Sequence, residues 1–340
     1  MLMSRVVYLV LSHTQPHQVA RLLRQLRPKD SNAHIVLHHD ETASHLDPDL
    51  LRGIGNIHRI PSRPLTWGDF SHVAAILRGM RWVRNHLPFD WLVLLSGQDY
   101  PIRPVSEIES FLSATEFDGF VKGSPVGAGP EADREGIRRY FYRYHRVPLA
   151  RRPSVDEEGR MAKTVRRARE AQPLISVKTA PSGLFLGVRR LRTPFSADFQ
   201  CYRGSTWFTI SSRCVEAVDR FIRANPSYLR HYRRTRSAAE SFIITILLND
   251  PGLNLSPDHL RYIRFRDGEP NPDILTRKDL KELRSSGKHF ARKFDVSVDP
   301  KILDVLDKGV LAGKPLRVRS TGATAGSGPV SGSPRQAAPE

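Results

Sequence analysis

The sequence predicts an α/β fold in which a mostly parallel, twisted sheet is covered by helices on both faces. Residues 5–12 and 33–38 are each expected to form a strand, and 17–26 carry apolar residues at helical spacing. A strand, a helix and a strand in this order connect most naturally as a parallel pair. Residues 91–95 are apolar without a break, which is typical of a strand covered on both faces.

Further elements follow along the chain. Strands are expected at 56–60, 117–122, 204–210 and 254–265, and helices at 71–85, 106–113, 212–224, 241–248, 276–285 and 300–308. Ser106, with Glu109 three residues later, predicts a capping box at one helix start. Residues 1–312 are expected to form a single domain, from which 123–182 make a basic, partly helical excursion. Residues 313–340 are dominated by Gly, Ser, Pro, Ala and Thr, a composition typical of a disordered tail.

Charge and cysteine content narrow the functional classes. The 340 residues include 53 Lys and Arg against 35 Asp and Glu, a net charge of +18. This excess favours polyanions or a phosphate-bearing donor or acceptor as partners; the composition bias of a GC-rich genome is the other explanation. Cys201 and Cys214 match no zinc spacing, so we expect reduced thiols in a cytoplasmic protein. The apolar run 6–11 is too short for a signal core or a membrane span.

Acidic side chains follow two of the predicted strands. Asp40 comes after the strand at 33–38, and Asp99 follows the strand at 91–95, with Pro101 stiffening the turn. Ligands of open α/β sheets bind at the carboxyl ends of strands, so Asp99 is a candidate ligand contact and Asp40 suits a ribose or base edge. A turn at the strand end explains Asp99 equally well. The chain has no Gly-x-Gly-x-x-Gly or Gly-Lys-Ser/Thr loop, which argues against dinucleotide and P-loop sites.

Three groups of motifs, in this order and spacing, resemble a known family. They are WG at 67–68 with LSGQDYPIR at 95–103, GSTWF at 204–208 with AESF at 239–242, and FARKFD at 290–295. Together they resemble the core-2/I-branching β-1,6-N-acetylglucosaminyltransferases and the peptide O-xylosyltransferases, over about residues 5–308. The AESF and ARKF forms are closer to the xylosyltransferases.

The resemblance implies a GT-A-like, inverting glycosyltransferase that uses a UDP-sugar of the N-acetylglucosamine or xylose type and needs no metal. By this similarity Glu240 is the catalytic base, and it is expected in the first turn of the helix at 241–248. An ordinary first-turn Glu is the other explanation. Inversion needs one carboxylate to take the proton of the attacking hydroxyl. The leaving diphosphate needs cations, a role that the resemblance gives to Lys293 and, on weaker grounds, to Arg292.

The resemblance also implies contacts with the rest of the donor. Asp99 is expected to meet the donor sugar, and Asp40 to lie near the uridine. Trp207 is expected to form part of a sugar platform, although a core position explains it at least as well. The Asp-x-Asp at 47–49 lies in an early loop, and we interpret it as a turn or helix start, not as a metal motif.

The chain also departs from the family. The branching enzymes carry an arginine some twenty residues before the lysine, where this chain has Pro270; Arg264, Arg266 or Arg277 are the possible substitutes. Ser96 stands where those enzymes have a cysteine. The animal proteins are Golgi-anchored and rich in disulfides, and this chain shows neither feature. We therefore expect a bacterial, cytoplasmic relative.

The basic surface and the Arg-Tyr segment bear on the partners of the protein and on alternative functions. The acceptor is a glycan, a lipid-linked or another hydroxyl compound, and the basic surface favours peripheral contact with the anionic inner face of a membrane. Interleaved Arg and Tyr at 139–144 are typical of nucleobase or sugar stacking and equally of a half-buried amphipathic helix. A basic nucleic-acid-binding protein is thus one alternative, but no groove-reading motif is present and no specific nucleic acid is expected. A glycan-binding relative without catalysis is the other.

Overall fold

The computed structural model describes residues 4–28, 31–66, 68–127, 133–147, 174–180, 183–266 and 271–309. The tail predicted at 313–340 lies outside these ranges, as do residues 148–173 of the predicted excursion, Trp67 and Pro270.

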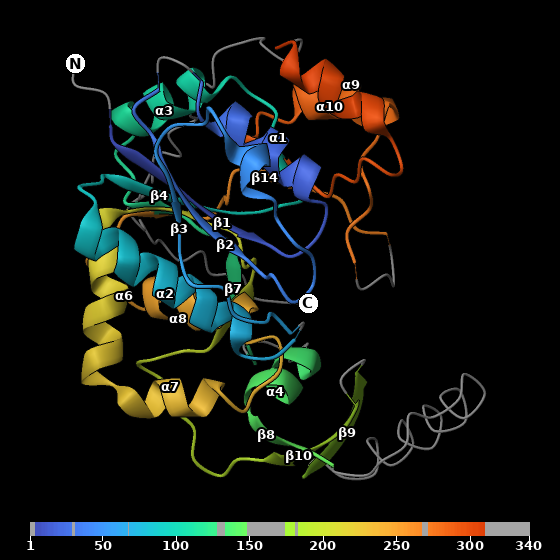
Figure 1. The fold of residues 1–340 in the computed structure, drawn as a ribbon. Coiled ribbons are helices and arrows are strands. Elements are labelled where there is room, and N and C mark those ends of the chain that lie inside the picture. Colours follow the sequence, from blue (N-terminus) through green and yellow to red (C-terminus); the bar gives the residue numbers. More distant parts are fainter. Residues whose placement is uncertain are drawn as a thin grey trace, which may run out of the picture.

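A seven-stranded, mostly parallel sheet forms the centre and confirms the predicted α/β class (Figure 1). Its order is β13-β6-β12-β4-β1-β2-β3. Strands β4, β1, β2 and β3 are parallel, whereas β12 runs antiparallel between β4 and β6. The strands are β1 (Val6–Ser12), β2 (His34–His39), β3 (Ile57–Arg59), β4 (Trp91–Ser96), β6 (Gly119–Phe120), β12 (Thr209–Ser211) and β13 (Leu255–Ser256).

Two layers of helices explain why the central strands are apolar without alternation. Side chains of β1 point alternately into two separate hydrophobic clusters, one on each face of the sheet, so every position is buried. One face carries α1 (Pro16–Leu26), α3 (Val105–Ala114), α9 (Leu280–Ser285) and α10 (Pro300–Asp307). The other face carries α2 (Ser71–His86), α6 (Ser212–Ala224), α7 (Pro226–Tyr232) and α8 (Phe242–Leu248) (Figure 1).

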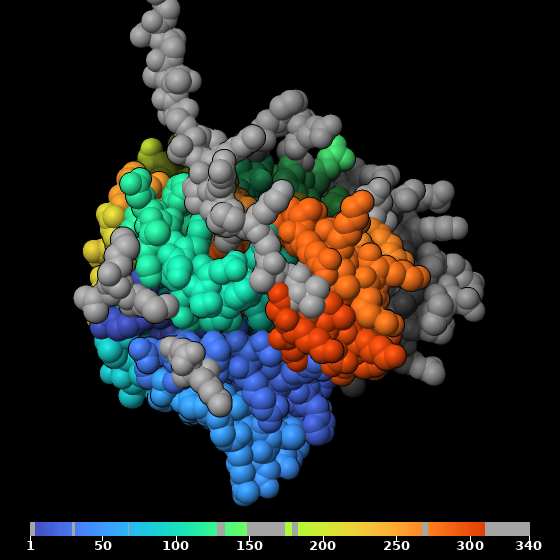
Figure 2. Space-filling model, turned by 90° about the horizontal axis from the view of Figure 1, so that it is seen from above, coloured from blue at the N-terminus to red at the C-terminus, as the bar shows by residue number. Residues whose placement is uncertain are grey.

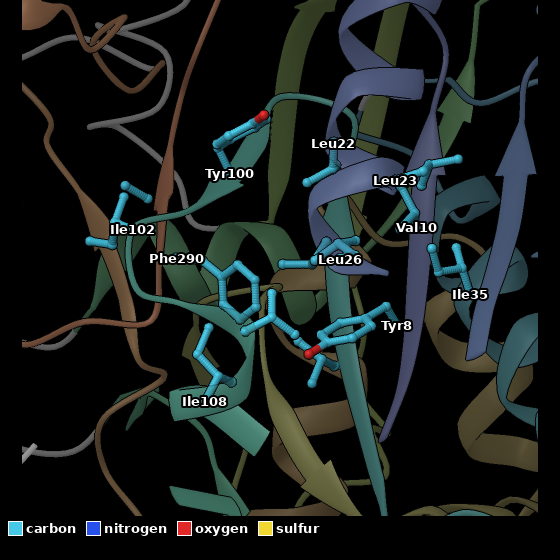
Figure 3. Close-up of a cluster of buried hydrophobic side chains, with 14 of the residues drawn as sticks. Tyr8, Val10, Leu22, Leu23, Leu26, Ile35, Tyr100, Ile102, Ile108 and Phe290 are labelled. Atoms are coloured by element: carbon cyan, nitrogen blue, oxygen red, sulfur yellow. The ribbon is translucent and has the colours of Figure 1, made fainter. Parts of the chain in front are cut away.

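The layer that contains α1 joins parts of the chain that are distant in sequence. Leu23 and Leu26 of α1 lie beside Val10 and Tyr8 of β1 in the cluster shown in Figure 3. Burying a side chain of this size contributes about 1.5–3 kcal/mol. Seen from this side, N-terminal residues in blue, the blue-green segment around α3 and the orange and red C-terminal residues form one continuous surface (Figure 2).

A second, three-stranded sheet carries candidate residues of the site. Its order is β14 (Arg261–Ile263), β15 (Phe290–Arg292), β5 (Asp99–Pro101). The single strand expected at 254–265 was wrong, because this segment divides between β13 in the large sheet and β14 in the small one. Pro257 lies at the division, where it cannot donate to a ladder. The pairing of β15 with β5 places Arg292 opposite Asp99.

A third sheet lies at one end of the molecule, next to α4 (Arg134–Tyr140) (Figure 1). It consists of β8 (Tyr142–Arg146), β10 (Gly183–Arg189) and β9 (Ile175–Ala180), all antiparallel. Nearby, β7 (Gly123–Pro125) pairs with β11 (Tyr202–Gly204). The Arg-Tyr segment at 139–144 therefore divides between a helix and a strand, and neither a single amphipathic helix nor a stacking surface is formed. Its three tyrosines are at most 7% exposed: Tyr140 is buried in α4, and Tyr142 and Tyr144 are the alternate side chains of β8 that pack inward.

The capping box expected at Ser106 was also wrong. Helix α3 begins at Val105, directly after Pro104, and no side chain caps it. Glu109 instead faces inward and is 4% exposed, and it accepts a hydrogen bond of 3.0 Å from the hydroxyl of Ser31. A tertiary partner has thus replaced the local one that the spacing predicts.

Fully buried His289 predicts a pH-dependent stability. Its ring packs edge-on against Phe111 at 4.8 Å, and within the described residues neither ring nitrogen has a hydrogen-bond partner. Burial, followed by the charge of Arg261, lowers the pKa of His289 from 6.5 to about 3. Only the unfolded chain binds this proton between these values, so the free energy of unfolding should fall as the pH decreases from 6.5 towards 3.

Replacing His289 with Phe should flatten this dependence, because Phe has no proton to bind. The measurement is the urea midpoint at pH 7 and at pH 5. The same exchange at exposed His17 is the control and should keep the steeper loss. An equal loss in both variants would contradict the assignment.

Candidate active site

A large cleft of about 1260 Å³ opens at the carboxyl ends of β1 and β4, where the sequence predicts ligand binding. Its wall includes Ser12 and His13 after β1, and Ser96 to Gln98 after β4. Loops from distant parts of the chain complete it. Among the candidate residues, Trp207, Glu240, Arg292 and Lys293 all line this cleft.

Glu240 ends a short 3-10 turn, η2 (Ala238–Glu240), which precedes α8. The expected position in the first turn of that helix was wrong, because α8 begins at Phe242. Between them Ser241 leaves helical geometry and is fully buried, its hydroxyl bonded to the phenol of Tyr232 and to the carbonyl of Tyr202. The side chain of Glu240 is 36% exposed and reaches the cleft from a tethered turn.

Arg139 is the direct partner of Glu240. Its Nη1 donates to Oε2 of Glu240 at 2.5 Å, and its Nε donates to Glu135 at 3.0 Å. Burial raises the pKa of Glu240 above its ordinary value of 4.5, while the charges of Arg139 and Arg203 act in the opposite direction. The carboxylate thus stays basic enough to accept a proton and is held in one orientation. Sequence reasoning missed this pair, because 101 residues separate its members.

Replacing Arg139 with Gln should raise the pKa of Glu240 further, because a neighbouring positive charge is lost. If Glu240 is the base, the acid limb of kcat/KM should move to higher pH. Arg139→Lys should show a smaller shift, since it keeps the charge. The measurement is a pH–rate profile of the three proteins, and superimposable acid limbs would contradict this coupling.

Lys293 follows β15 directly. Within the described residues no carboxylate oxygen lies within 4.0 Å of its ammonium group, although the group lines the cleft. Burial, followed by the charge of Arg292, lowers the pKa of Lys293 from its ordinary value. An ammonium group without a close carboxylate, next to a second cation, is an arrangement that suits a bound anion.

Arg292, the neighbour of Lys293, lines the same cleft, and its side chain is 12% exposed. Its Cζ lies 4.1 Å from the centre of the Trp207 ring, and its Nε lies 3.6 Å from Oδ1 of Asp99. Two of its nitrogens, Nε and Nη1, have no hydrogen-bond partner in the described structure. Trp207 therefore holds the arginine by a cation–π contact while its own side chain lines the cleft.

The two candidate aspartates lie behind the wall of the cleft. Asp99 is 1% exposed; it accepts a hydrogen bond from the backbone N–H of Ser96 and closes the turn after β4. Asp40 is 3% exposed and accepts hydrogen bonds from Thr42 and from the backbone N–H of Leu65, which itself lines the cleft. Burial disfavours its charge, but these hydrogen bonds prevail and the pKa of Asp40 is lowered. Donor contacts by both residues stay predictions.

The possible substitutes for the missing family arginine are all paired with carboxylates. Arg264 and Arg266 both contact Asp273 at 2.9 Å, and Arg277 contacts Asp299 at 3.1 Å. None of the three lines the cleft. Their charges are therefore neutralised within the fold.

Arg261 lines the cleft instead, although no motif of the sequence points to it. Its side chain is 2% exposed. The guanidinium donates to backbone carbonyls of β4 and its neighbours, Leu94 at 3.1 Å and Phe208 at 2.7 Å. Burial lowers the pKa of Arg261 to about 9. It fixes the small sheet against the large one and adds positive charge to the floor of the site.

Gln18 ties the loop after Lys293 to the turn after β4. Its amide donates to the carbonyls of Gly97 at 3.0 Å and Phe294 at 3.1 Å, and it accepts from the N–H of Val296 at 3.0 Å. The residue is 2% exposed in the first turn of α1. A polar side chain on the apolar face of a predicted helix is the signal that would have identified it.

Other features of the described residues bear on cofactors and surroundings. No three His, Cys, Asp or Glu side chains in those ranges are grouped so as to hold a metal ion. Asp47 of the Asp-x-Asp sequence caps η1 (Pro48–Leu51), which confirms its interpretation as a helix start. Cys201 and Cys214 are free and buried. Among the helices of the described segments, none combines the length and apolar character that crossing a bilayer requires.

Comparison with known proteins agrees with this geometry. Residues 6–129, which contain β1, β4 and the turn at Asp99, match the model of the Core-2/I-Branching enzyme family. Over these residues the chain is thus similar to the Core-2/I-branching enzymes. These enzymes form a family of glycosyltransferases.

Similar curated proteins extend the likeness along the chain. Xylosyltransferase 1 of Canis lupus familiaris and of Homo sapiens are each 24% identical over 331 residues, which covers 89% of this chain and 30% of theirs. Xylosyltransferase 2 of Canis lupus familiaris is 25% identical over 329 residues, which covers 89% of this chain and 33% of that protein. The chain thus spans about a third of the length of these relatives.

Proposed function

We propose that this chain, whose residues 6–129 match the Core-2/I-Branching enzyme model, is an inverting, metal-independent glycosyltransferase. It moves a sugar of the N-acetylglucosamine or xylose type from a UDP-sugar to a hydroxyl acceptor. The observation that carries the proposal is that Glu240 and Lys293, 53 positions apart in the sequence, line one cleft. A candidate base and a candidate diphosphate-binding cation therefore face the same space.

The proposed reaction is a single displacement. The acceptor oxygen attacks the anomeric carbon of the donor while its proton passes to the carboxylate of Glu240. The bond between that carbon and the diphosphate oxygen breaks, and UDP leaves with the electron pair. Attack from the face opposite the leaving group inverts the anomeric centre.

The cations at the end of β15 support departure of UDP without a metal ion. Lys293 supplies an ammonium group to the diphosphate, and Arg292 supplies guanidinium donors that lack partners within the described structure. Such preorganised charges stabilise the negative charge that develops on the leaving group. Trp207 keeps Arg292 in place, and Asp40 and Asp99 shape the loops beneath the nucleotide and the sugar.

The nucleic-acid alternative loses one of its two motivations, the Arg-Tyr segment, and keeps the net charge of +18. The tyrosines of the segment at 139–144 are buried, so they present no stacking surface for bases. Arg139 of the same segment is bound to Glu240 and Glu135. A glycan-binding relative without catalysis is separated from an enzyme by a transfer assay.

A thermal-shift series in excess EDTA tests the donor class. UDP and at least one UDP-sugar should raise the melting temperature of the full chain, because they bind only the folded state. GDP-linked sugars are the control and should give smaller shifts. Stabilisation that appears only after Mg²⁺ or Mn²⁺ is added would contradict metal independence, and no shift with any uridine nucleotide would contradict the donor class.

A further inference from the structure

The proposed acceptor must reach Glu240 from the side of the cleft that the donor cations leave open. Phe290 of β15 packs in the hydrophobic cluster on one face of the central sheet, and Tyr140 of α4 packs in the cluster on the other face. Lys293, three residues after Phe290, and Arg139, next to Tyr140, are therefore carried by segments packed on opposite faces of the sheet. Figure 1 shows α4, β8 and β10 together at one end of the molecule, away from β14.

Arg236 stands on this second side, four residues before Glu240. Its backbone N–H donates to the carbonyl of Arg139 at 3.2 Å, and the next N–H donates to Gly68 at 2.8 Å. Its Cζ lies 4.7 Å from the centre of the Phe185 ring in β10. Gly68, whose φ is +79°, leaves space for the guanidinium group of Arg236. A Cβ at this position would lie 3.3 Å from a guanidinium nitrogen.

The charge of Arg236 is not neutralised within the described residues. No carboxylate oxygen in those ranges lies within 4.0 Å of its nitrogens, and the side chain is half-buried. Burial lowers the pKa of Arg236, an effect that Tyr144 and Asp69 oppose and Arg139 reinforces. An anion that binds beside a partly buried cation of this kind stabilises its charge and forms charge-assisted hydrogen bonds with it.

Arg146 extends the same surface. It is paired across the strands with Phe185, so both side chains stand on one face of the sheet. Arg146 is exposed, and the described part of the chain places no carboxylate within 4.0 Å of it. Arg236, Phe185 and Arg146 thus form a row, in which Arg236 lies over the Phe185 ring and Arg146 is opposite Phe185 on the neighbouring strand. The row adjoins the cleft that Glu240 lines, because Gly68 and Ser237, which contact or follow Arg236, are part of its wall.

We infer that this row is an acceptor subsite for a sugar that carries a negatively charged group, either a carboxylate or a phosphate. The inference rests on the proposed function, which sets Glu240 as the point where the acceptor hydroxyl must arrive. Guanidinium groups bind such anions through two parallel hydrogen bonds. The Phe185 ring offers an apolar face to the sugar ring between them.

Calorimetry on the full chain, with UDP saturating the donor end, tests this subsite. Tetragalacturonate should bind about tenfold tighter than its full methyl ester, which has the same sugars without charge. Glucose 6-phosphate against glucose gives the corresponding comparison for phosphate. A preference for either acid supports the subsite and identifies the anion that it takes.

Variants locate the binding. Arg236→Gln and, separately, Arg146→Gln should remove most of the preference for the acid, and exposed Arg146 is a safe second variant if Arg236→Gln folds poorly. Arg220→Gln on the exposed face of α6 is the matched control for net charge and should keep the preference. Equal binding of acid and neutral ligand, or equal loss in all three variants, would overturn the inference. A chain that fails to bind UDP would count against the proposed function instead.

Discussion

Replacing Glu240 with Gln should lower kcat by about 10²–10⁴-fold, the contribution typical of a general base. Gln keeps the shape of the side chain and can still contact Arg139, but it cannot accept the proton of the acceptor hydroxyl. The cleft, the cations at the end of β15 and the fold remain. UDP should therefore bind nearly as tightly as before. The measurement is a transfer assay together with a UDP titration of the same protein.

Glu216→Gln is the matched control, because Glu216 is an exposed glutamate on the surface of α6. It should leave both transfer and UDP binding unchanged. Turnover of the Glu240 variant at the wild-type rate would show that another group takes the proton. Loss of UDP binding together with activity would point to a structural defect at η2 and not to a lost base.

Replacing Lys293 with Met should lower kcat about 10²–10³-fold, if the ammonium stabilises the leaving diphosphate as a preorganised donor does elsewhere. Met keeps the length of the side chain and removes its charge. UDP should bind about tenfold to a hundredfold more weakly, since a hydrogen bond to a charged group is lost. Uridine, which has no diphosphate, should bind as to the wild type. Comparing the two ligands by calorimetry isolates the diphosphate contact.

Lys301→Met on the exposed start of α10 controls for the general loss of a positive charge. It should affect neither ligand. Equal weakening of UDP and uridine in the Lys293 variant would mean that the loop after β15 has moved. In that case Lys293 would be a structural residue, and the proposal for the leaving group would fail.

Much of the fold followed from hydrophobic patterns over short distances. The runs at β1, β2 and β4, and the helical spacing in α1, α2 and α6, predicted elements that the structure contains. These elements are buried on a whole face or on both faces, so their periodicity survives in the sequence. The wrong predictions of helix starts and strands lie where a tertiary contact replaced the interaction between sequence neighbours. Glu109 accepts a hydrogen bond from Ser31 and does not cap its helix, and the segment at 254–265 is divided between two sheets.

The candidate site was predictable in part for a different reason. Glu240, Lys293, Arg292 and Trp207 were selected through motifs that resemble a family, and all four line the cleft. Residues without a motif were missed. Arg139 reaches Glu240 across 101 positions and Gln18 reaches Val296 across 278, and Arg236 is recognised only by the ring that it covers.

What the amino-acid sequence determined by itself is the α/β class, the central apolar strands and the motif residues that resemble a glycosyltransferase family. Local apolar periodicity and short motifs encode these, because both are properties of neighbouring residues. The tertiary structure alone decided that Arg139 holds Glu240, that Asp99 lies behind Arg292, and that Arg264 is neutralised while Lys293 faces the cleft. The physical reason is that the protonation and the available interactions of a charged side chain depend on its partners and its burial. Both are set by segments that only the folded chain brings together.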